Sequence, residues 1–267
     1  MHPMLNIAVR AARAAGNLIA RNLGQNDLFE VEEKQHNDFV TTIDKECEQT
    51  IVNTLLKSYR DHGILSEEAG NLGNPDSEYQ WIIDPLDGTM NFVQGIAHSA
   101  VSIALTQNGR TELGVVFDPM LNEMFTAIRG GGASLNGRRL RVANRDSLDA
   151  ALICTAFPTR HRERMSAYLE IFNRLINHCA DMRRSGSAAL DLCYVACGRF
   201  DGYLEQGLKP WDFAAGELIV REAGGLVSDF AGENDYRQSG NVVAANPQIL
   251  RALIKICDPQ SLPAVLR

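Results

Sequence analysis

Apolar residues in the first part of the chain recur at the spacing of an α-helix. Within residues 1–23 they lie three or four positions apart and so share one helix face. The members of this stripe are Leu5, Ala8, Val9, Ala12, Ala15, Ile19 and Leu23. The segment carries three arginines and no acidic residue, a composition that loosely resembles a transit peptide. The helical spacing favours instead an amphipathic helix packed on the body of the protein.

A second helical stripe and several shorter apolar segments follow. Residues 37–59 predict a turn and then a helix, whose apolar positions are Ile43, Cys47, Ile51 and Leu55. Residues 62–70 are a short apolar segment that runs into two glutamates, and residues 79–88 predict a short strand with an abrupt end. Residues 99–137 alternate apolar segments with the turn signals QNGR, DPMLN and RGGG, which predicts an antiparallel sheet.

The pattern changes near residue 145, after which segments of strand and helix character alternate. Strands are predicted at residues 151–158, 200–206 and 226–230, and helices at residues 165–180, 187–198 and 211–225. We therefore predict an α/β (α+β) layered protein with two closely packed halves, residues 1–145 and 146–267.

Composition narrows the class of protein. The 267 residues are 45% hydrophobic and 22% charged, enough to bury a sizeable core in one large or two smaller domains. The net charge of -7 argues against a general nucleic-acid binder and is compatible with cation binding. The sequence contains no run of 18 apolar residues, so it predicts no membrane-spanning helix. The six cysteines form no CxxC pair and no signal peptide is recognisable, so we expect reduced thiols in a cytoplasmic protein.

The most informative chemistry stands at the end of the predicted strand at residues 79–88. Asp84 and Asp87 flank Pro85, which ends the strand, and Gly88 allows a tight turn that folds Asp87 back toward Asp84. Two carboxylates this close repel each other unless a cation or a proton lies between them. Hard oxygen ligands suit Mg²⁺, and the lack of a His/Cys cluster argues against zinc.

Two other interpretations of these aspartates are open at this point. Taken alone, the segment is equally compatible with an ordinary turn and solvated aspartates, because Asp, Pro and Gly all favour turns. A phosphatase of the haloacid-dehalogenase type uses an aspartate nucleophile in DxDx[TV]. Here the aspartates are three residues apart, not two, and a proline stands between them.

Several segments together resemble the inositol monophosphatase family of Mg²⁺-dependent phosphatases. The signature is "DPLDGT" at residues 84–89, followed by Phe92 as the aromatic residue. The matching segments occur in the family's order from about residue 34 to 225: "NDFVTTID", "SEEAG", the signature, "RRSGSAALDL" and "LEQGLKPWDFAAGELIVREAGG". The resemblance implies a layered α-β-α-β-α sandwich of the inositol monophosphatase and fructose-1,6-bisphosphatase type. The first half would carry the metal site on its antiparallel sheet, and the second would complete the active site and substrate pocket.

The resemblance also implies roles for individual residues. A metal cluster would be held by Glu67, Asp84, Asp87, Asp212 and the backbone carbonyl of Leu86. Thr89 and Asp44 would orient and deprotonate the attacking water, with Glu67 assisting through the same water. The substrate would contact Asp87, Gly88, Thr89, Arg183, Gly186, Ser187, Ala188, Glu205 and Asp212, with the phosphate on the N–H groups of Gly88 and Thr89.

The expected activity is that of an inositol-1-monophosphatase that uses Mg²⁺, is inhibited by lithium and acts as a homodimer. Related enzymes act on nucleotide 3′-phosphates, fructose 1,6-bisphosphate or histidinol phosphate, and residues 157–165 and 183–210 are expected to determine the choice. The start of the chain and its overall register resemble most a bacterial member with a role in ribosomal RNA transcription antitermination. That implies RNA polymerase and Nus factors as partners, and a mainly regulatory protein docking on them is the alternative.

Two of the site positions also have simpler explanations. Ser187 is equally suited to cap the helix predicted at residues 187–198, and Asp212 could cap the helix that begins near it.

Met90 departs from the small hydroxyl residue that many family members carry at this position. A methionine cannot replace a hydroxyl as a donor, so we predict that Met90 packs under the loop as an apolar filler.

Overall fold

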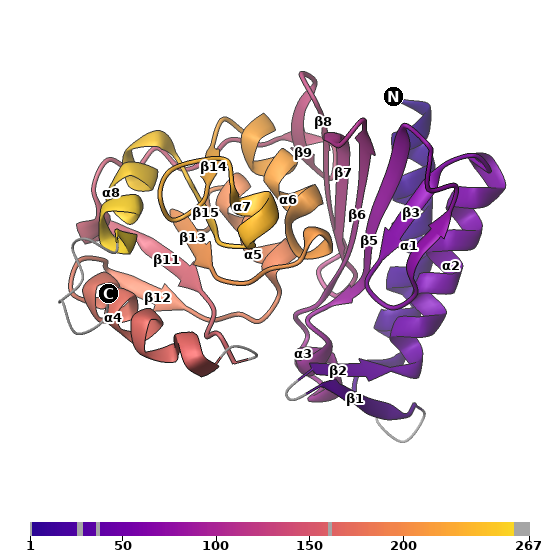
Figure 1. Ribbon diagram of the computed structural model, residues 1–267, viewed down its shortest axis with the longest axis horizontal. Helices are drawn as coiled ribbons and strands as arrows, with labels where there is room; N and C mark the ends of the chain where they lie inside the picture. Colours follow the sequence, from indigo (N-terminus) through magenta and orange to yellow (C-terminus); the bar gives the residue numbers. More distant parts are fainter. Residues whose placement is uncertain (1, 26–28, 36–37, 160–161, 259–267) are drawn as a thin grey trace.

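A computed structural model describes residues 2–25, 29–35, 38–159 and 162–258 of the protein (Figure 1). Its α-helices are α1 (Pro3–Asn22), α2 (Thr42–Ser58), α3 (Thr89–Val93), α4 (Met165–Ile176), α5 (Ala188–Ala196), α6 (Pro210–Glu222), α7 (Tyr236–Ser239) and α8 (Pro247–Cys257). Its strands are β1 (Val31–Gln35), β2 (Asp38–Thr41), β3 (Gly63–Ser66), β4 (Gly70–Gly73), β5 (Tyr79–Asp87), β6 (Ala100–Gln107), β7 (Arg110–Asp118), β8 (Glu123–Ile128), β9 (Gly132–Leu135), β10 (Arg138–Arg139), β11 (Leu152–Thr155), β12 (Asp181–Arg183), β13 (Gly202–Glu205), β14 (Leu226–Ser228) and β15 (Val242–Ala245). Short 3-10 helices are η2 (Leu148–Ala150) and η3 (Arg162–Arg164).

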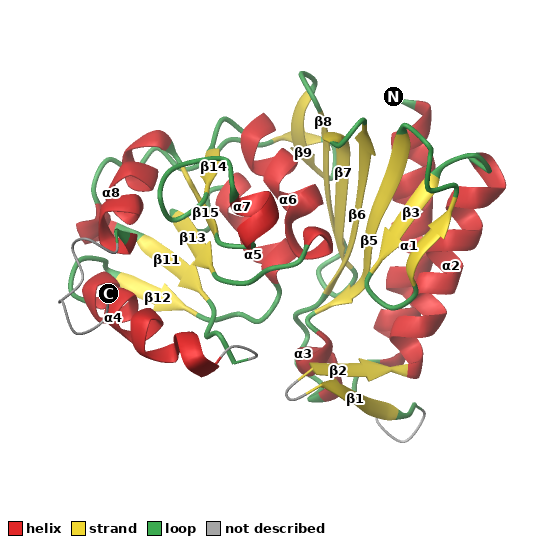
Figure 2. Ribbon diagram, in the orientation of Figure 1, coloured by secondary structure: helices red, strands yellow, loops and turns green. Residues whose placement is uncertain are grey.

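Helices and sheets alternate in five layers (Figures 1 and 2). Helices α1 and α2 cover one face of an eight-stranded sheet, and α5 and α6 lie between its other face and a five-stranded sheet. Helices α4 and α8 pack together beyond the second sheet. The predicted α-β-α-β-α sandwich is therefore confirmed. It follows from helices that each bury an apolar face on a sheet.

The eight-stranded sheet has the order β10-β9-β8-β7-β6-β5-β3-β4. Strands β5 to β10 pair antiparallel, as predicted for residues 99–137, and only β3 and β5 run parallel. The predicted turns contain Asn108 and Asn122, whose φ angles of 50° and 52° fall in the left-handed region that asparagine tolerates. The second sheet is mixed, in the order β12-β11-β13-β15-β14.

The predicted apolar stripes form the core on the outer side of the first sheet. Leu5, Ala8 and Ile19 of α1 are buried there together with Cys47 and Ile51 of α2. All six cysteines are free thiols, in agreement with the expectation from their spacing. None of the helices in the described ranges combines the length and hydrophobicity needed to cross a bilayer.

The structure differs from the predicted elements in several places, and strands β1, β4 and β12 are among the elements that were not predicted. The turn predicted before α2 is strand β2, which pairs with β1 in a small hairpin. No element was predicted for α7, β15 and α8 near the end of the described chain, although β15 lies inside the second sheet. The first sheet ends at Arg139 and the second begins at Leu152, and the division into residues 1–145 and 146–267 remains a prediction.

Candidate active site

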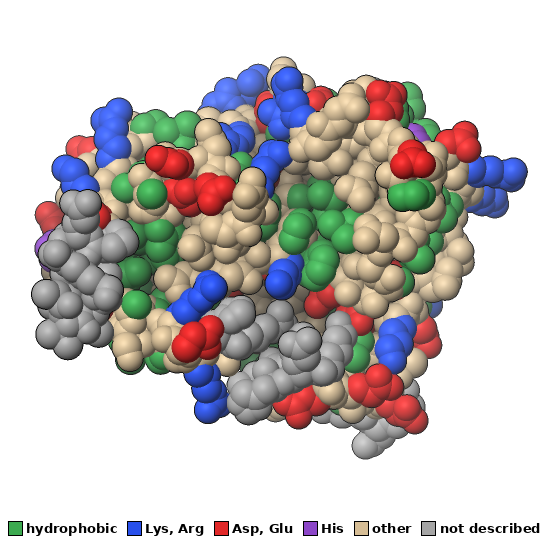
Figure 3. Space-filling view, viewed as in Figure 1, with side chains coloured by type: hydrophobic (Ala, Val, Ile, Leu, Met, Phe, Trp, Pro, Cys, Tyr) green, Lys and Arg blue, Asp and Glu red, His purple; other side chains and the backbone are tan. Residues whose placement is uncertain are grey.

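A cavity of about 180 Å³ lies where residues of the two halves meet. The space-filling view shows this face of the molecule hollowed between the halves (Figure 3). The first half lines the cavity with Phe39, Glu67, Asp84, Leu86, Asp87, Gly88, Thr89 and Met90. The second half lines it with Ala156, Phe157, Pro158, Thr159, Arg184, Gly186, Ala188, Asp191, Glu205, Gln206, Gly207, Leu208 and Asp212.

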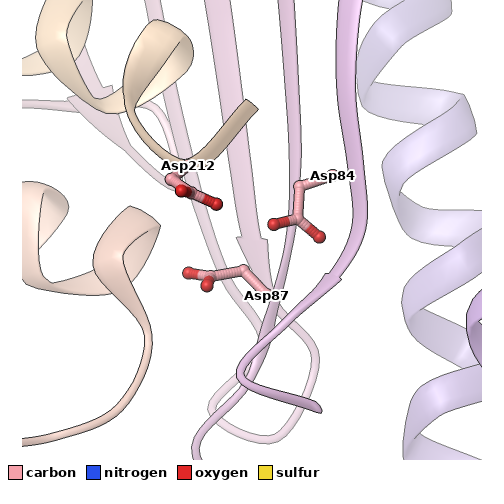
Figure 4. Close-up of side chains that lie close together, drawn as sticks. All are labelled: Asp84, Asp87 and Asp212. Carbon is pink, nitrogen blue, oxygen red and sulfur yellow. The ribbon is translucent and has the colours of Figure 1, made fainter. Parts of the chain in front are cut away.

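Three aspartates converge in this cavity. Asp84, Asp87 and Asp212 each offer one carboxylate oxygen, and these oxygens lie within 4.8 Å of one another (Figure 4). Asp84 and Asp87 come from the end of β5, where the pairing with β6 shifts register between them. Pro85 stands at this shift, and because it has no N–H it cannot continue the ladder. The prediction that Asp84 and Asp87 lie close together is confirmed. The prediction that Pro85 ends the strand is wrong, because β5 continues to Asp87, which pairs with Ala100 after the shift.

Backbone N–H groups donate hydrogen bonds that orient the carboxylates of Asp84 and Asp212. Leu86 N–H donates to Asp84 Oδ1 at 3.0 Å. Lys209 N–H donates to Asp212 Oδ2 at 2.6 Å, across the first turn of α6. Asp212 is therefore not the N-cap of α6, because Lys209 occupies that position and Asp212 bonds back to it from inside the helix.

Asp87 is held by the second half of the molecule. Its Oδ2 accepts hydrogen bonds from Ser187 Oγ at 2.6 Å and from Ala189 N–H at 2.8 Å. Ser187 is also the N-cap of α5, since its hydroxyl oxygen accepts from Leu190 N–H. The capping role considered for Ser187 is confirmed, and the same hydroxyl orients a carboxylate of the cluster.

The cluster carries unfavourable negative charge by itself. Burial, followed by the charges of Glu67, Asp87 and Asp212, raises the pKa of Asp84 well above its usual range. A cation between the carboxylates would relieve both effects. The three aspartates supply carboxylate oxygens, which fit a hard metal ion. Leu86, whose carbonyl the family resemblance adds to the ligands, lines the same cavity.

Thr89 and Asp44 form a pair beside the cluster. Thr89 Oγ1 lies 3.2 Å from Asp44 Oδ1 and 3.1 Å from the carbonyl oxygen of Leu86, and it can donate to either. Asp44 is buried at the start of α2, where Oδ2 accepts from the N–H and hydroxyl of Thr41. Burial is the main reason why the pKa of Asp44 is raised to about 6. The structure thus brings together the pair that the resemblance assigned to the attacking water.

The opposite wall contains part of the predicted alcohol-binding set. Gly186, Ala188 and Glu205 line the cavity. Glu205 Oε2 accepts a hydrogen bond from Tyr203 Oη at 2.5 Å, and burial raises the pKa of Glu205 to about 7.

Arg183 is not among the residues that line the cavity. Its Nη1 lies 2.5 Å from Asp181 Oδ2 and donates also to the carbonyl oxygen of Met182. The neighbouring Arg184 lines the cavity instead.

Asp191 is a cavity residue that the sequence analysis missed. It lies on α5, is 1% exposed and accepts a hydrogen bond from Ser185 Oγ. Burial raises the pKa of Asp191 to about 7. The signal was present in the sequence, because Asp191 is the one acid in the otherwise apolar "AALDLCYVA" of α5.

The prediction for Met90 is wrong. Its side chain is 44% exposed at the cavity wall rather than packed under the loop. It is the second residue of the short helix α3, whose buried positions are Asn91 and Phe92. Within the segment expected to affect substrate choice, Phe157 and Thr159 reach the cavity, and residues 160–161 lie outside the described ranges.

Comparisons with known protein families, curated proteins and solved structures all identify similar proteins. Residues 1–260 match the inositol monophosphatase family. The Nus factor SuhB of Escherichia coli K12 is 56% identical over 254 residues, 95% of each chain. The crystal structure of the extragenic suppressor protein suhB from Bartonella henselae superposes with a TM-score of 0.94 at 41% identity, covering 97% of this chain and 99% of that one. An inositol monophosphatase from Anabaena (Nostoc) sp. PCC 7120 gives a TM-score of 0.85 at 36% identity and 98% coverage of both chains.

Proposed function

The chain belongs to the inositol monophosphatase family, and we propose that it is a Mg²⁺-dependent phosphomonoesterase acting on an inositol monophosphate or a similar polyol phosphate. The observation that carries this proposal is the convergence of Asp84, Asp87 and Asp212 in a cavity between the two halves. An ordinary turn with solvated aspartates would not bury Asp84 or recruit an acid from a distant helix.

The metal would be held by Glu67, Asp84, Asp87, Asp212 and the carbonyl of Leu86. Mg²⁺ bound there would neutralise charge on the phosphoryl group and lower the pKa of a water molecule. The protein's own contribution is to aim the carboxylates. Leu86 and Lys209 donate to one oxygen of Asp84 and of Asp212, which restricts the rotation of both side chains.

Thr89 would orient the attacking water. When Thr89 Oγ1 donates to Asp44, its lone pairs are free to accept a proton from water at the cavity wall. Asp44 is buried behind it and would receive a proton through this hydroxyl, with Glu67 assisting from the other side. The attack would be in line on phosphorus, with no covalent phosphoenzyme.

The substrate would lie across the cavity from the first half to the second. The phosphate would rest on the N–H groups of Gly88 and Thr89, where α3 begins. The alcohol would contact Gly186, Ser187, Ala188, Glu205 and Asp212, as the family resemblance implies. Arg184, which lines the cavity, would take the place of the implied Arg183. Glu205 suits a polyol because a buried carboxyl group can bond directly to a hydroxyl.

A phosphate-release assay tests this proposal. Inositol 1-phosphate should be hydrolysed in a Mg²⁺-dependent and lithium-sensitive reaction, faster than a nucleotide 3′-phosphate, fructose 1,6-bisphosphate or histidinol phosphate. Asp87→Asn should remove nearly all activity and leave the fold intact. Wild-type turnover in that variant, or a trapped aspartyl-phosphate, would refute the mechanism.

A second function is supported by the 56% identity with a protein named Nus factor SuhB. We propose that the protein is a homodimer that also docks on RNA polymerase and Nus factors. A pull-down with and without Mg²⁺ tests the docking, and absence of binding in both conditions would exclude it. Light scattering of the purified protein tests the dimer.

A further inference from the structure

Glu48 is a buried acid that accepts hydrogen bonds from the segment that carries Glu67. It lies on α2 and is 7% exposed. One carboxylate oxygen, Oε2, accepts hydrogen bonds from Ser66 Oγ, from Glu68 N–H at 3.1 Å and from Ala69 N–H at 3.2 Å. The donors therefore lie on both sides of Glu67 in the turn between β3 and β4.

These bonds have a clear energetic reason. A buried carboxylate is costly unless hydrogen bonds replace its lost hydration. The three donors to Glu48 come from one short turn, so satisfying the carboxylate also fixes the backbone of that turn. The backbone of Glu67 is also held by β5, because the Glu67 N–H donates to the carbonyl oxygen of Ile83 at 3.2 Å.

The same face of α2 reaches a second part of the site. Asp44 and Glu48 are four residues apart on α2, so their side chains are neighbours on one helix face. Asp44 contacts Thr89, and Glu48 holds the turn of Glu67. Helix α2 thus contacts both Thr89 and the turn that carries Glu67, and both of these residues line the cavity.

We propose that Glu48 is a positioning residue, which sets where the Glu67 carboxylate lies relative to Thr89 and the aspartate cluster. The effect on the turn is independent of any activity. The effect on turnover rests on the proposed phosphatase function.

Hydrogen exchange of the full chain without metal tests the first part. Glu48→Ala should accelerate exchange of the Glu68 and Ala69 amides about tenfold, because both lose their acceptor. The matched control is Glu46→Ala, which removes an exposed acid from the same helix and should leave both amides unchanged. Unchanged exchange of both amides in a folded Glu48→Ala variant would overturn the proposal.

A double-mutant cycle tests whether Glu48 acts through Glu67. With Mn²⁺ alone as the probe, Glu48→Ala should weaken metal binding about tenfold in the wild-type background. In a Glu67→Ala background the same change should alter binding less than about twofold, since the residue that Glu48 positions is already absent. Equal losses in both backgrounds would show a general structural role and refute positioning.

Kinetics add a third readout, if inositol 1-phosphate is a substrate. Glu48→Ala should lower kcat about tenfold with little change in KM, and Glu48→Gln, whose amide oxygen can accept the same bonds, should recover most of kcat. If Glu48→Ala does not fold, Ser66→Ala removes one donor from the same oxygen and should give a smaller loss with the same dependence on Glu67. A wild-type protein without phosphatase activity would refute the proposed function, while the exchange and Mn²⁺ measurements would still decide the role of Glu48.

Discussion

Ser187 Oγ donates a hydrogen bond to Asp87 Oδ2 at 2.6 Å, between residues that are 100 positions apart in the sequence. The bond joins the end of β5 in the first sheet to the N-cap of α5 in the second half. Because Ala189 N–H donates to the same oxygen, the start of α5 fixes the orientation of Asp87. Packing of α5 against the end of β5 therefore also sets the orientation of a carboxylate in the proposed metal site.

Ser187→Ala should weaken metal binding more than it destabilises the fold. It removes the hydroxyl that donates to Asp87, and loss of such an orienting bond typically costs about 10- to 100-fold in metal affinity. Loss of the N-cap should lower the free energy of unfolding by about 1 kcal/mol. Titration calorimetry with Mg²⁺ and urea unfolding of the metal-free protein measure the two effects.

Two variants separate the orienting bond from the cap in this experiment. Ser187→Thr keeps the hydroxyl and should retain near wild-type affinity. Ser147→Ala removes the N-cap of η2, away from the cavity lining, and should leave Mg²⁺ affinity unchanged. If Ser187→Ala bound Mg²⁺ as tightly as the wild type, the bond to Asp87 would have no role in the metal site.

Gly88→Ala should disrupt the site through its backbone. Gly88 has a φ of 93°, and an added Cβ would lie 3.0 Å from the carbonyl oxygen of His98 and 3.2 Å from that of Gly186. The left-handed conformation alone costs about 1–2 kcal/mol in a residue with a Cβ. We expect a lower melting temperature and a loss of phosphatase activity.

Gly109→Ala is the matched control for Gly88. Its φ of 75° imposes a similar conformational cost, but no atom lies within 4 Å of the added Cβ. It should lower the melting temperature less and leave activity intact. Equal effects of the two substitutions on activity would contradict a specific role for the close approach at Gly88.

The sequence predicted those parts of the site that depend on local geometry. Asp84 and Asp87 could be placed together because they are three residues apart and Pro85, which has no N–H, interrupts the regular strand pairing between them. Asp212 could be assigned only through the family resemblance, since its distance from Asp84 depends on how α6 packs against the first sheet. The bond from Ser187 to Asp87 depends on the same packing and could not be predicted from either segment alone.

Elements without a clear hydrophobic pattern were also missed. Strand β1 has exposed side chains at Val31, Glu32 and Glu33, so it shows no alternation of apolar and polar residues. Met90 was misplaced for a related reason. A hydrophobic residue is buried by default in sequence reasoning, but exposure at a cavity wall is decided by the direction of the helix that carries it.

Arg184→Ala should impair substrate binding, whereas Arg183→Ala should not. Arg184 lines the cavity, and removing one charged group that bonds to substrate typically raises KM about tenfold. Arg183 pairs with Asp181 and is expected to change KM less than about twofold when replaced. Steady-state kinetics of the two variants with inositol 1-phosphate make the comparison. The reverse order of effects would support the assignment of Arg183 that the family resemblance implies.

Asp191 should make the stability of the metal-free protein depend on pH. Burial raises its pKa from 3.8 to about 7, so between these values the folded state binds more protons than the unfolded state. The stabilisation from protonated Asp191 is therefore complete below about pH 4 and is lost as the pH rises through about 7. Over this range the free energy of unfolding should fall by at most about 1.4 kcal/mol for each step of one in pH.

Asp191→Asn isolates this contribution. The amide oxygen can still accept the bond from Ser185, but the side chain does not titrate. The free energy of unfolding of the wild type, measured in urea relative to Asp191→Asn, should decrease steadily from about pH 4.5 to about pH 7.5. A difference that stays constant over this range would show that Asp191 is already ionised in the folded protein at the acid end. Its carboxylate would then be stabilised by charges such as Arg184 more strongly than its burial indicates.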